Sequence, residues 1–156
     1  MRSGDMRSFR LAIAGAVLGV TLFPTMPLLR AQAWDLNKTR SVAESQHEIV
    51  MILIRKKEFD KAAEEANKIF QMKWPEDQEP ILSKELIWFA GQFHRNRQSA
   101  LAVRLLETNL SMFKTVKSKV AIWKEKGYLL EAMGQHDKAL DCFREAQRLE
   151  KAGGHP

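Results

Sequence analysis

Residues 120–151, VAIWKEKGYLLEAMGQHDKALDCFREAQRLEK, divide into two helical halves around a turn at residues 134–137. Two antiparallel helices approach closely only where one of them presents Gly or Ala, and a large ring then fills the space that remains. The stretch predicts such a hairpin, because it carries small and aromatic residues at fixed offsets on both sides of the turn. These residues are Trp123, Gly127, Ala139, Phe143 and Ala146.

The order of these residues (a Trp, a Gly four positions on, a turn, then small, aromatic and small residues) resembles the signature of the tetratricopeptide repeat (TPR) family. The resemblance implies an all-α fold in which about three helical hairpins stack as a short right-handed superhelix, or solenoid. It also implies that the first helix of each hairpin lines a concave surface that binds another protein.

Two earlier segments show the helical spacing of apolar residues that predicts further hairpins. Small residues at matching places, Ala62, Ala100 and Ala139, recur after 38 and 39 residues. Recurrence of a hairpin that cannot bury its apolar side alone is the physical basis of a solenoid. The middle segment departs furthest from the family pattern, which leaves a plain helical bundle as the alternative. The three hairpins are expected at about residues 41–74, 83–114 and 119–151.

The helix boundaries are predicted from capping residues. Ser41 with Glu44 three positions on matches a capping box, so the first helix is expected to begin there. Residues 76–83 contain a proline and are expected to form a loop, with Ser83 capping the next helix. Residues 115–119 are expected to link the second hairpin to the third.

The N-terminal segment has the features of a secretory signal. Three arginines precede a 13-residue apolar run at residues 11–23. That run is short for a bilayer core of ~30 Å but has the length of a signal's apolar core. A small-x-small sequence then ends at Ala33. We expect a signal peptide at residues 1–33, cut after Ala33, and a periplasmic or secreted helical-repeat domain at residues 34–156. An uncleaved N-terminal anchor is the alternative.

The charge and the single cysteine narrow the classes of partner. Residues 1–33 contribute four arginines and one aspartate, so the formal charge of the rest is +6 − 3 = +3. Such a mild excess, with acidic and basic residues interspersed, indicates a solvated helical surface and no nucleic-acid interface. Because Cys142 is alone, neither an intrachain disulfide nor a cysteine-based metal site is expected.

Motifs for catalysis are missing from the sequence. It has no Gly-rich phosphate loop, no HExxH and no G-x-S-x-G. Glu44 and His47 have the spacing of half a di-metal carboxylate site, but the sequence lacks a second such pair. We therefore expect no enzymatic activity, no cofactor and no metal.

The predicted partner-binding surface follows from the family resemblance. Its rings, its methionine and its charges of both signs suit an extended or helical peptide. For Met51 and Phe89, burial in the core is the alternative. The predicted partner-binding residues are His47, Met51, Arg55, Glu85, Phe89, Gln92, Lys124, Tyr128 and Glu131. The residues predicted to pack the repeats are Ala62, Ala100, Trp123, Gly127, Ala139, Phe143 and Ala146.

The sequence thus predicts an exported, non-catalytic scaffold that binds another protein, in an envelope complex. A homo-oligomer formed through a terminal repeat is also expected, because an end hairpin leaves one apolar side uncovered. The alternative function is that of a membrane-tethered, self-associating helical structural protein. Contact with a membrane is expected only if the N-terminal segment is uncleaved.

Overall fold

A computed structural model describes residues 26–153 of the chain, and the side chains of residues 36–153. Within this range the chain forms helices and no strand, so the predicted all-α class is confirmed. The helices are α1 (Met26–Arg55), α2 (Phe59–Gln71), α3 (Glu79–Arg95), α4 (Ser99–Asn109), α5 (Val116–Ala132) and α6 (His136–Gly153). Two short 3-10 turns, η1 (Glu76–Gln78) and η2 (Leu110–Met112), precede α3 and follow α4.

The predicted signal peptide lies largely outside the described residues. Its apolar run at residues 11–23 is not described, and the predicted cut after Ala33 falls within α1, where side chains are not described. Export therefore stays a prediction. Within residues 26–153, none of the helices combines the length and the apolar content that crossing a bilayer requires.

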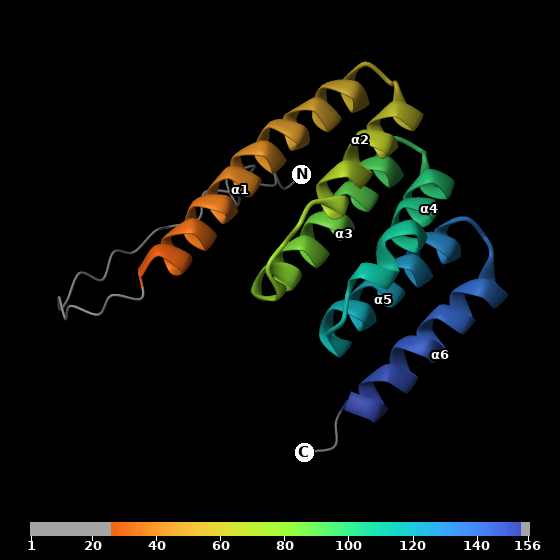
Figure 1. Cartoon of the computed structure of the whole chain (residues 1–156). Coiled ribbons are helices and arrows are strands. Elements are labelled where there is room, and N and C mark those ends of the chain that lie inside the picture. Colours follow the sequence, from red (N-terminus) through yellow and green to blue (C-terminus); the bar gives the residue numbers. More distant parts are fainter. Residues whose placement is uncertain (1–25, 154–156) are drawn as a thin grey trace, which may run out of the picture.

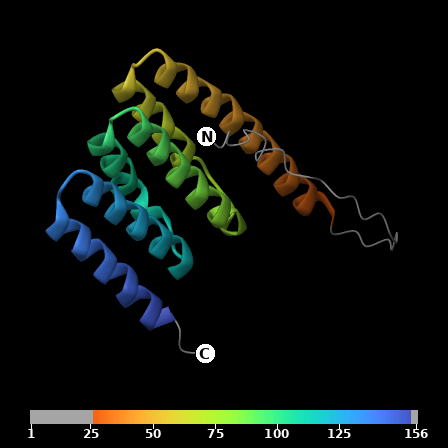
Figure 2. The same ribbon diagram turned by 180° about the vertical axis from the view of Figure 1, so that it is seen from behind.

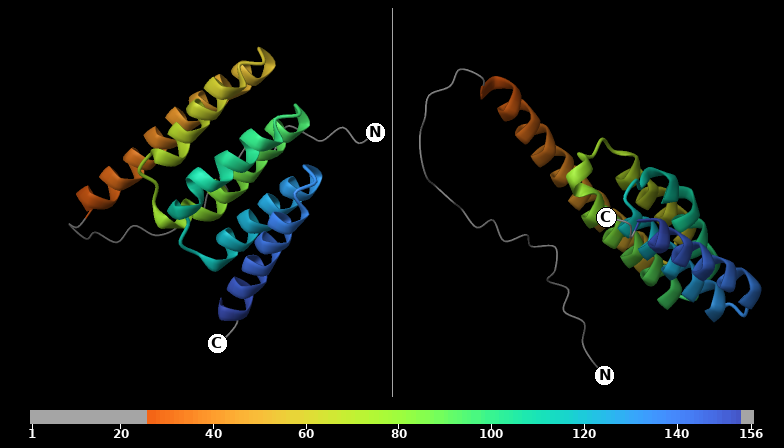
Figure 3. Two further views of the ribbon diagram at one scale, coloured as in Figure 1. Left: turned by 90° about the vertical axis from the view of Figure 1, so that its right-hand side faces the viewer. Right: turned by 90° about the horizontal axis from the view of Figure 1, so that it is seen from below.

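The helices pair as three antiparallel hairpins that stack in chain order. α1 packs on α2, α3 on α4 and α5 on α6, and neighbouring hairpins meet through α2 with α4 and α3 with α5 (Figure 1). A view turned by 90° shows the three hairpins as successive layers (Figure 3). The N-terminal part of α1 extends past the ends of the other helices, which is also clear from behind (Figure 2). The N-terminal and C-terminal hairpins thus form the two ends of the stack.

The three hairpins turn in the same way. The turn residues Lys57, Arg97 and Gly134 have φ of 63°, 63° and 73°. Each donates its backbone N–H to the carbonyl three positions back, and the next residue donates to the carbonyl five positions back, at 2.8–2.9 Å. This pair of bonds is the Schellman motif, which closes a helix by placing one residue in the left-handed region. The same turn, 40 and then 37 residues apart, shows that one structural unit recurs.

The α3 helix lies at the centre of the core. Leu86, Phe89 and Phe93 have no exposed surface, because α2, α4 and α5 all contact α3. Apolar residues cover most of the circumference of α3, as expected for a helix enclosed by neighbours. The second and third hairpins therefore share one continuous core with the first.

The predicted close approach of α5 and α6 is confirmed. A Cβ placed on Gly127 would lie 2.8 Å from two ring atoms of Phe143, nearer than packed atoms come. Ala139 and Ala146 are buried on α6, and Ala62 has the corresponding position on α2. Trp123 is half-buried and packs against the core. Glycine at position 127 is thus what lets the Phe143 ring approach α5 so closely.

The predicted starts of three helices are wrong. α1 runs straight through Ser41, whose carbonyl accepts a 3.1 Å hydrogen bond from Ser45, so no capping box forms. α3 begins at Glu79 because a proline fits the first turn of a helix, where its missing N–H is not needed. α5 begins at Val116, with the Thr115 side chain accepting from the backbone N–H of the serine three positions on.

The assignment of Ala100 as a repeat-packing residue is also wrong. Ala100 is exposed, and the buried small residue of α4 is Ala102, with no exposed surface. Counted from the turn residues, Ala102 corresponds to Ala62 and Ala139: each donates its N–H to the residue directly after the turn residue, at 2.9–3.0 Å. The true repeat offsets are therefore 40 and 37 residues, and the middle hairpin departs less from its neighbours than the predicted alignment suggests.

Candidate functional site

The recurring turn defines which residues occupy equivalent places on α1, α3 and α5. Positions ten, six and three residues before each turn residue form one set, which we call the first-helix face. On α5 these are the predicted partner-binding residues Lys124, Tyr128 and Glu131. The whole first-helix face comprises His47, Met51, Ile54, Ile87, Gly91, His94, Lys124, Tyr128 and Glu131.

At the α1 end this face is closed by side chains of α3. Nδ1 of His47 lies 2.5 Å from Oε1 of Glu85, and both side chains are mostly covered. The His47 ring also stacks on Trp88, with centroids 4.9 Å apart at 28°. Met51 packs against the core and Ile54 is 5% exposed. The first and second hairpins are thus joined here by the pair of His47 and Glu85.

Several predicted partner-binding residues do not lie on this face. Phe89 has no exposed surface and sits 5.1 Å from the His47 ring and 6.4 Å from Phe70, so the core alternative holds for it. Glu85 and Gln92 are half-buried on α3 but do not occupy the equivalent positions, which belong to Ile87, Gly91 and His94. Arg55 is exposed one position beyond its place on the face.

Toward α5 the first-helix face opens. The Tyr128 side chain is 59% exposed, although its ring meets Phe143 edge-on at 5.1 Å. Glu131 is exposed, and Lys124 forms a 2.7 Å ion pair with Glu150 of α6. An exposed tyrosine held in place by a second ring offers a large, pre-ordered contact area to a partner.

Gly91 lies on the same face, in the middle of α3, and nothing packs against it. A Cβ placed there would meet only one guanidinium nitrogen of Arg95, at 3.9 Å. Glycine in a helix interior costs roughly 0.5–1 kcal/mol relative to alanine. No neighbour within the described chain benefits from this gap, in contrast to Gly127, where the Phe143 ring fills it.

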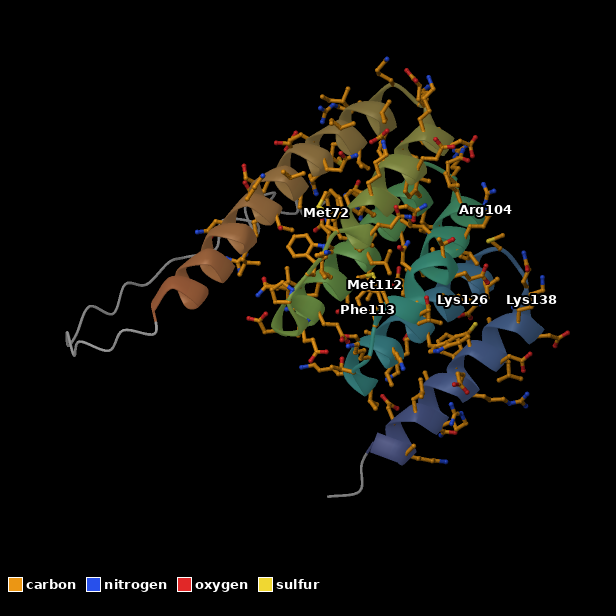
Figure 4. All side chains as sticks on the ribbon, in the orientation of Figure 1. Met72, Arg104, Met112, Phe113, Lys126 and Lys138 are labelled. Carbon is orange, nitrogen blue, oxygen red and sulfur yellow. The ribbon has the colours of Figure 1, made fainter. Side chains whose placement is uncertain are left out.

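A concave feature lies between α4, α5 and α6. It is a cavity of about 580 Å³ with an apolar base that includes Val103, Leu130 and Met133. Ala100 lines this cavity, and so does Trp123, which also packs against the core. Lys126 of α5 and Lys138 of α6 lie at its edge (Figure 4).

Lys126 of this cavity is already paired with a carboxylate. Nζ of Lys126 lies 2.7 Å from Glu107 of α4 and 4.8 Å above the Trp123 ring, so this lysine links the second and third hairpins. Cys142 lies at the base, and burial raises the pKa of its thiol. The thiol is therefore neutral near pH 7 and a poor nucleophile. Among residues 36–153, no group of three His, Cys, Asp or Glu side chains that could hold a metal ion gathers.

Glu125 of α5 is a half-buried carboxyl group. Burial raises the pKa of its carboxyl group, and the nearby His94 at the end of α3 works in the opposite direction. Glu125 lies on α5 beside the contact with α3, so it adds polarity between the second and third hairpins. A single half-buried carboxyl without a nucleophile or a second acid supplies no catalytic pair.

Comparison of the chain with protein-family models, with characterised proteins and with solved structures finds no match. The geometry of the first-helix face and of the cavity is therefore what bears on function.

Sequence reasoning missed Gly91 because it placed the middle hairpin two positions out of step. The signal was present: the turn at residues 96–98 is read correctly from the sequence, and counting from it selects Ala102 and Gly91. The cavity had no sequence signal, since α4 and α6 border it without forming a hairpin with each other.

Proposed function

We propose that this protein is an exported, TPR-like scaffold without catalytic activity, which binds a segment of another protein along its first-helix face. The recurring Schellman turn and the buried alanine five residues after each turn residue support a repeat architecture. The contact between Gly127 and Phe143 supports the resemblance to the TPR family in the third hairpin. In such a stack the first helices of successive hairpins form one continuous binding surface.

The observation that carries the proposal is an open helical glycine and an exposed tyrosine at equivalent positions. Gly91 and Tyr128 occupy these positions on neighbouring helices, α3 and α5. The gap at Gly91 gives room for an approaching side chain, and Tyr128 offers an exposed ring on the next first helix. Aromatic residues in such places contribute most of the binding energy of protein interfaces. The partner is a peptide segment with an apolar anchor, flanked by groups that complement Lys124 and Glu131.

The experiment places a side chain in the open space beside Gly91. Gly91→Phe places a ring where the partner's anchor would bind, whereas Gly91→Ala is the matched control that keeps the space nearly open. Partners are captured by cross-linking in the native host and quantified by mass spectrometry, with helicity checked by circular dichroism. We expect the same partner with wild type and Gly91→Ala, and at least a tenfold loss with Gly91→Phe and with Tyr128→Ala.

Equal recovery of that partner from Gly91→Phe and Gly91→Ala would exclude the first-helix face as the binding surface. The intact mass and the cell fraction of the same purified protein test the export part of the proposal. A mass that lacks residues 1–33, found outside the cytoplasm, supports export and release. An intact N-terminus in the membrane fraction supports the tethered alternative.

A further inference from the structure

An apolar stripe runs along the outer side of α1, at the N-terminal end of the stack. Val42, Ile49 and Ile52 are 48%, 44% and 47% exposed. They are seven and three residues apart, so they follow one another along a single face of the helix. The face turned toward α2 and α3 carries Ala43, Val50 and Ile54 instead, all buried. Within the described chain, the stripe therefore takes no part in packing the monomer.

The opposite end of the stack is different. The outer residues of α6 are mainly charged or polar, and Leu140, 47% exposed, is the large apolar side chain that stands out among them. A repeat stack needs polar outer faces on its terminal hairpins to stay soluble. Here the C-terminal hairpin meets this need and the N-terminal hairpin does not. Head-to-tail association would set the stripe against a charged surface, whereas a two-fold arrangement sets it against itself.

We propose that the C-terminal part of the stripe, Ile49 and Ile52, is the interface for a second copy of this chain, with the two α1 helices antiparallel about a two-fold axis near residues 50 and 51. In this register Ile49 of each copy faces Ile52 of the other. The same register brings Glu48 of each copy beside Arg55 of the other, because both lie on one side of the stripe, seven residues apart.

The charged residues beside the stripe favour a second copy of the chain as its partner. Neither Glu48 nor Arg55 pairs with an opposite charge within residues 36–153, although many other charged side chains of the helices are paired. The antiparallel register creates two ion pairs that the monomer lacks. A parallel arrangement would place Glu48 and Arg55 of one copy on the opposite side of the seam from those of the other copy, so these ion pairs could not form. Complementary charges beside an apolar seam set orientation in helix pairs.

The stripe and the first-helix face lie on different sides of α1. His47 and Met51 point toward α3, whereas Ile49 and Ile52 point to solvent. Self-association through α1 is therefore separate from the binding of another protein, and Gly91→Phe leaves it unchanged.

Sedimentation equilibrium of the full chain tests the proposal. We expect a dimer whose dissociation constant is on the order of micromolar, as suits a small interface. Ile52→Gln is expected to raise that constant at least tenfold. Leu140→Gln is the matched control, because Leu140 is equally exposed but lies at the other end of the stack; it is expected to leave the constant unchanged.

Charge reversal then tests the register. Glu48→Arg and Arg55→Glu should each weaken the dimer, and the double variant should restore it, because the pairs re-form with exchanged signs. A protein that stays monomeric up to about 200 µM overturns the proposal, since even a weak specific interface associates at that concentration. So does a dimer that Ile52→Gln leaves intact. A double variant weaker than both single variants overturns the antiparallel register.

Discussion

A buried carboxylate, Glu79 of α3, ties the second hairpin to the start of the third. It is 7% exposed and accepts hydrogen bonds from the backbone N–H groups of Lys114 and Thr115, at 3.0 and 2.8 Å, and from the Thr115 hydroxyl at 2.6 Å. Burial raises the pKa of this carboxyl group, but these hydrogen bonds outweigh burial, and the net pKa is lowered. The ionised form of Glu79 therefore stabilises the folded state.

Glu79→Gln should destabilise the protein by about 1–3 kcal/mol, because an amide cannot accept all of these bonds and leaves buried donors unmatched. Glu76→Gln is the control: its ion pair with Lys114 is largely exposed, and we expect a change below about 0.5 kcal/mol. Urea unfolding at pH 7 measures both.

The lowered pKa also predicts that the contribution of Glu79 is present above pH 4.5 and is lost as the pH falls below that value. In the Glu79→Gln variant, the unfolding free energy should depend less on pH in this range. An unchanged pH dependence would show that Glu79 is not its source.

At the scale of the element, each of the three hairpin turns requires one residue in the left-handed conformation. A left-handed conformation is free for glycine but costs other residues roughly 1–2 kcal/mol. Gly134 adopts this conformation without strain, whereas Lys57 and Arg97 adopt it at that cost. The turn geometry is therefore imposed by the packing of the hairpins and not by local sequence alone.

Lys57→Gly and Arg97→Gly should each stabilise the protein by up to about 1 kcal/mol, since the backbone strain is removed. Gly134→Ala should destabilise it by about 1 kcal/mol for the same reason. Gly91→Ala has the opposite sign, because Gly91 lies in a helix interior with open space around it. Urea midpoints of the four variants test the set. Destabilisation by Lys57→Gly would show that its side chain matters more than its backbone.

The elements themselves were predicted better than their ends. The hairpin turns at residues 57–58, 96–98 and 134–135 follow from the sequence pattern, because helical periodicity stops there. The starts of α1, α3 and α5 did not follow, since serine, proline and threonine are compatible with both a cap and an interior or first-turn position. Which of these a residue adopts depends on what the helix meets in three dimensions.

At the scale of the whole molecule, α1 is much longer than the surface it packs on. Among the side chains that are described, Arg40 donates a 2.8 Å hydrogen bond to Gln78 of η1, and Ala43 is buried. The part of α1 before these residues projects from the stack (Figures 1 and 2). The predicted cut after Ala33 would thus remove helix that lies outside the packed body.

A chain that begins at Trp34 should therefore unfold with a free energy within about 0.5 kcal/mol of that of the full chain. Urea unfolding followed by circular dichroism measures it, and a chain that begins at Ala43 is the control. We expect the shorter control to be less stable, because it loses the bond between Arg40 and Gln78. A loss of stability on removing residues 1–33 would show that this segment belongs to the folded domain.

The sequence by itself determined the helical class, the three hairpins and the close contact of Gly127 with Phe143. These features depend on periodicity and on residue size, which are local properties. Only the tertiary structure decided that Phe89 is core, that the space beside Gly91 stays open, and that α1 carries an uncovered stripe. These depend on which helices meet and which faces remain without a neighbour, and short-range patterns do not contain that information.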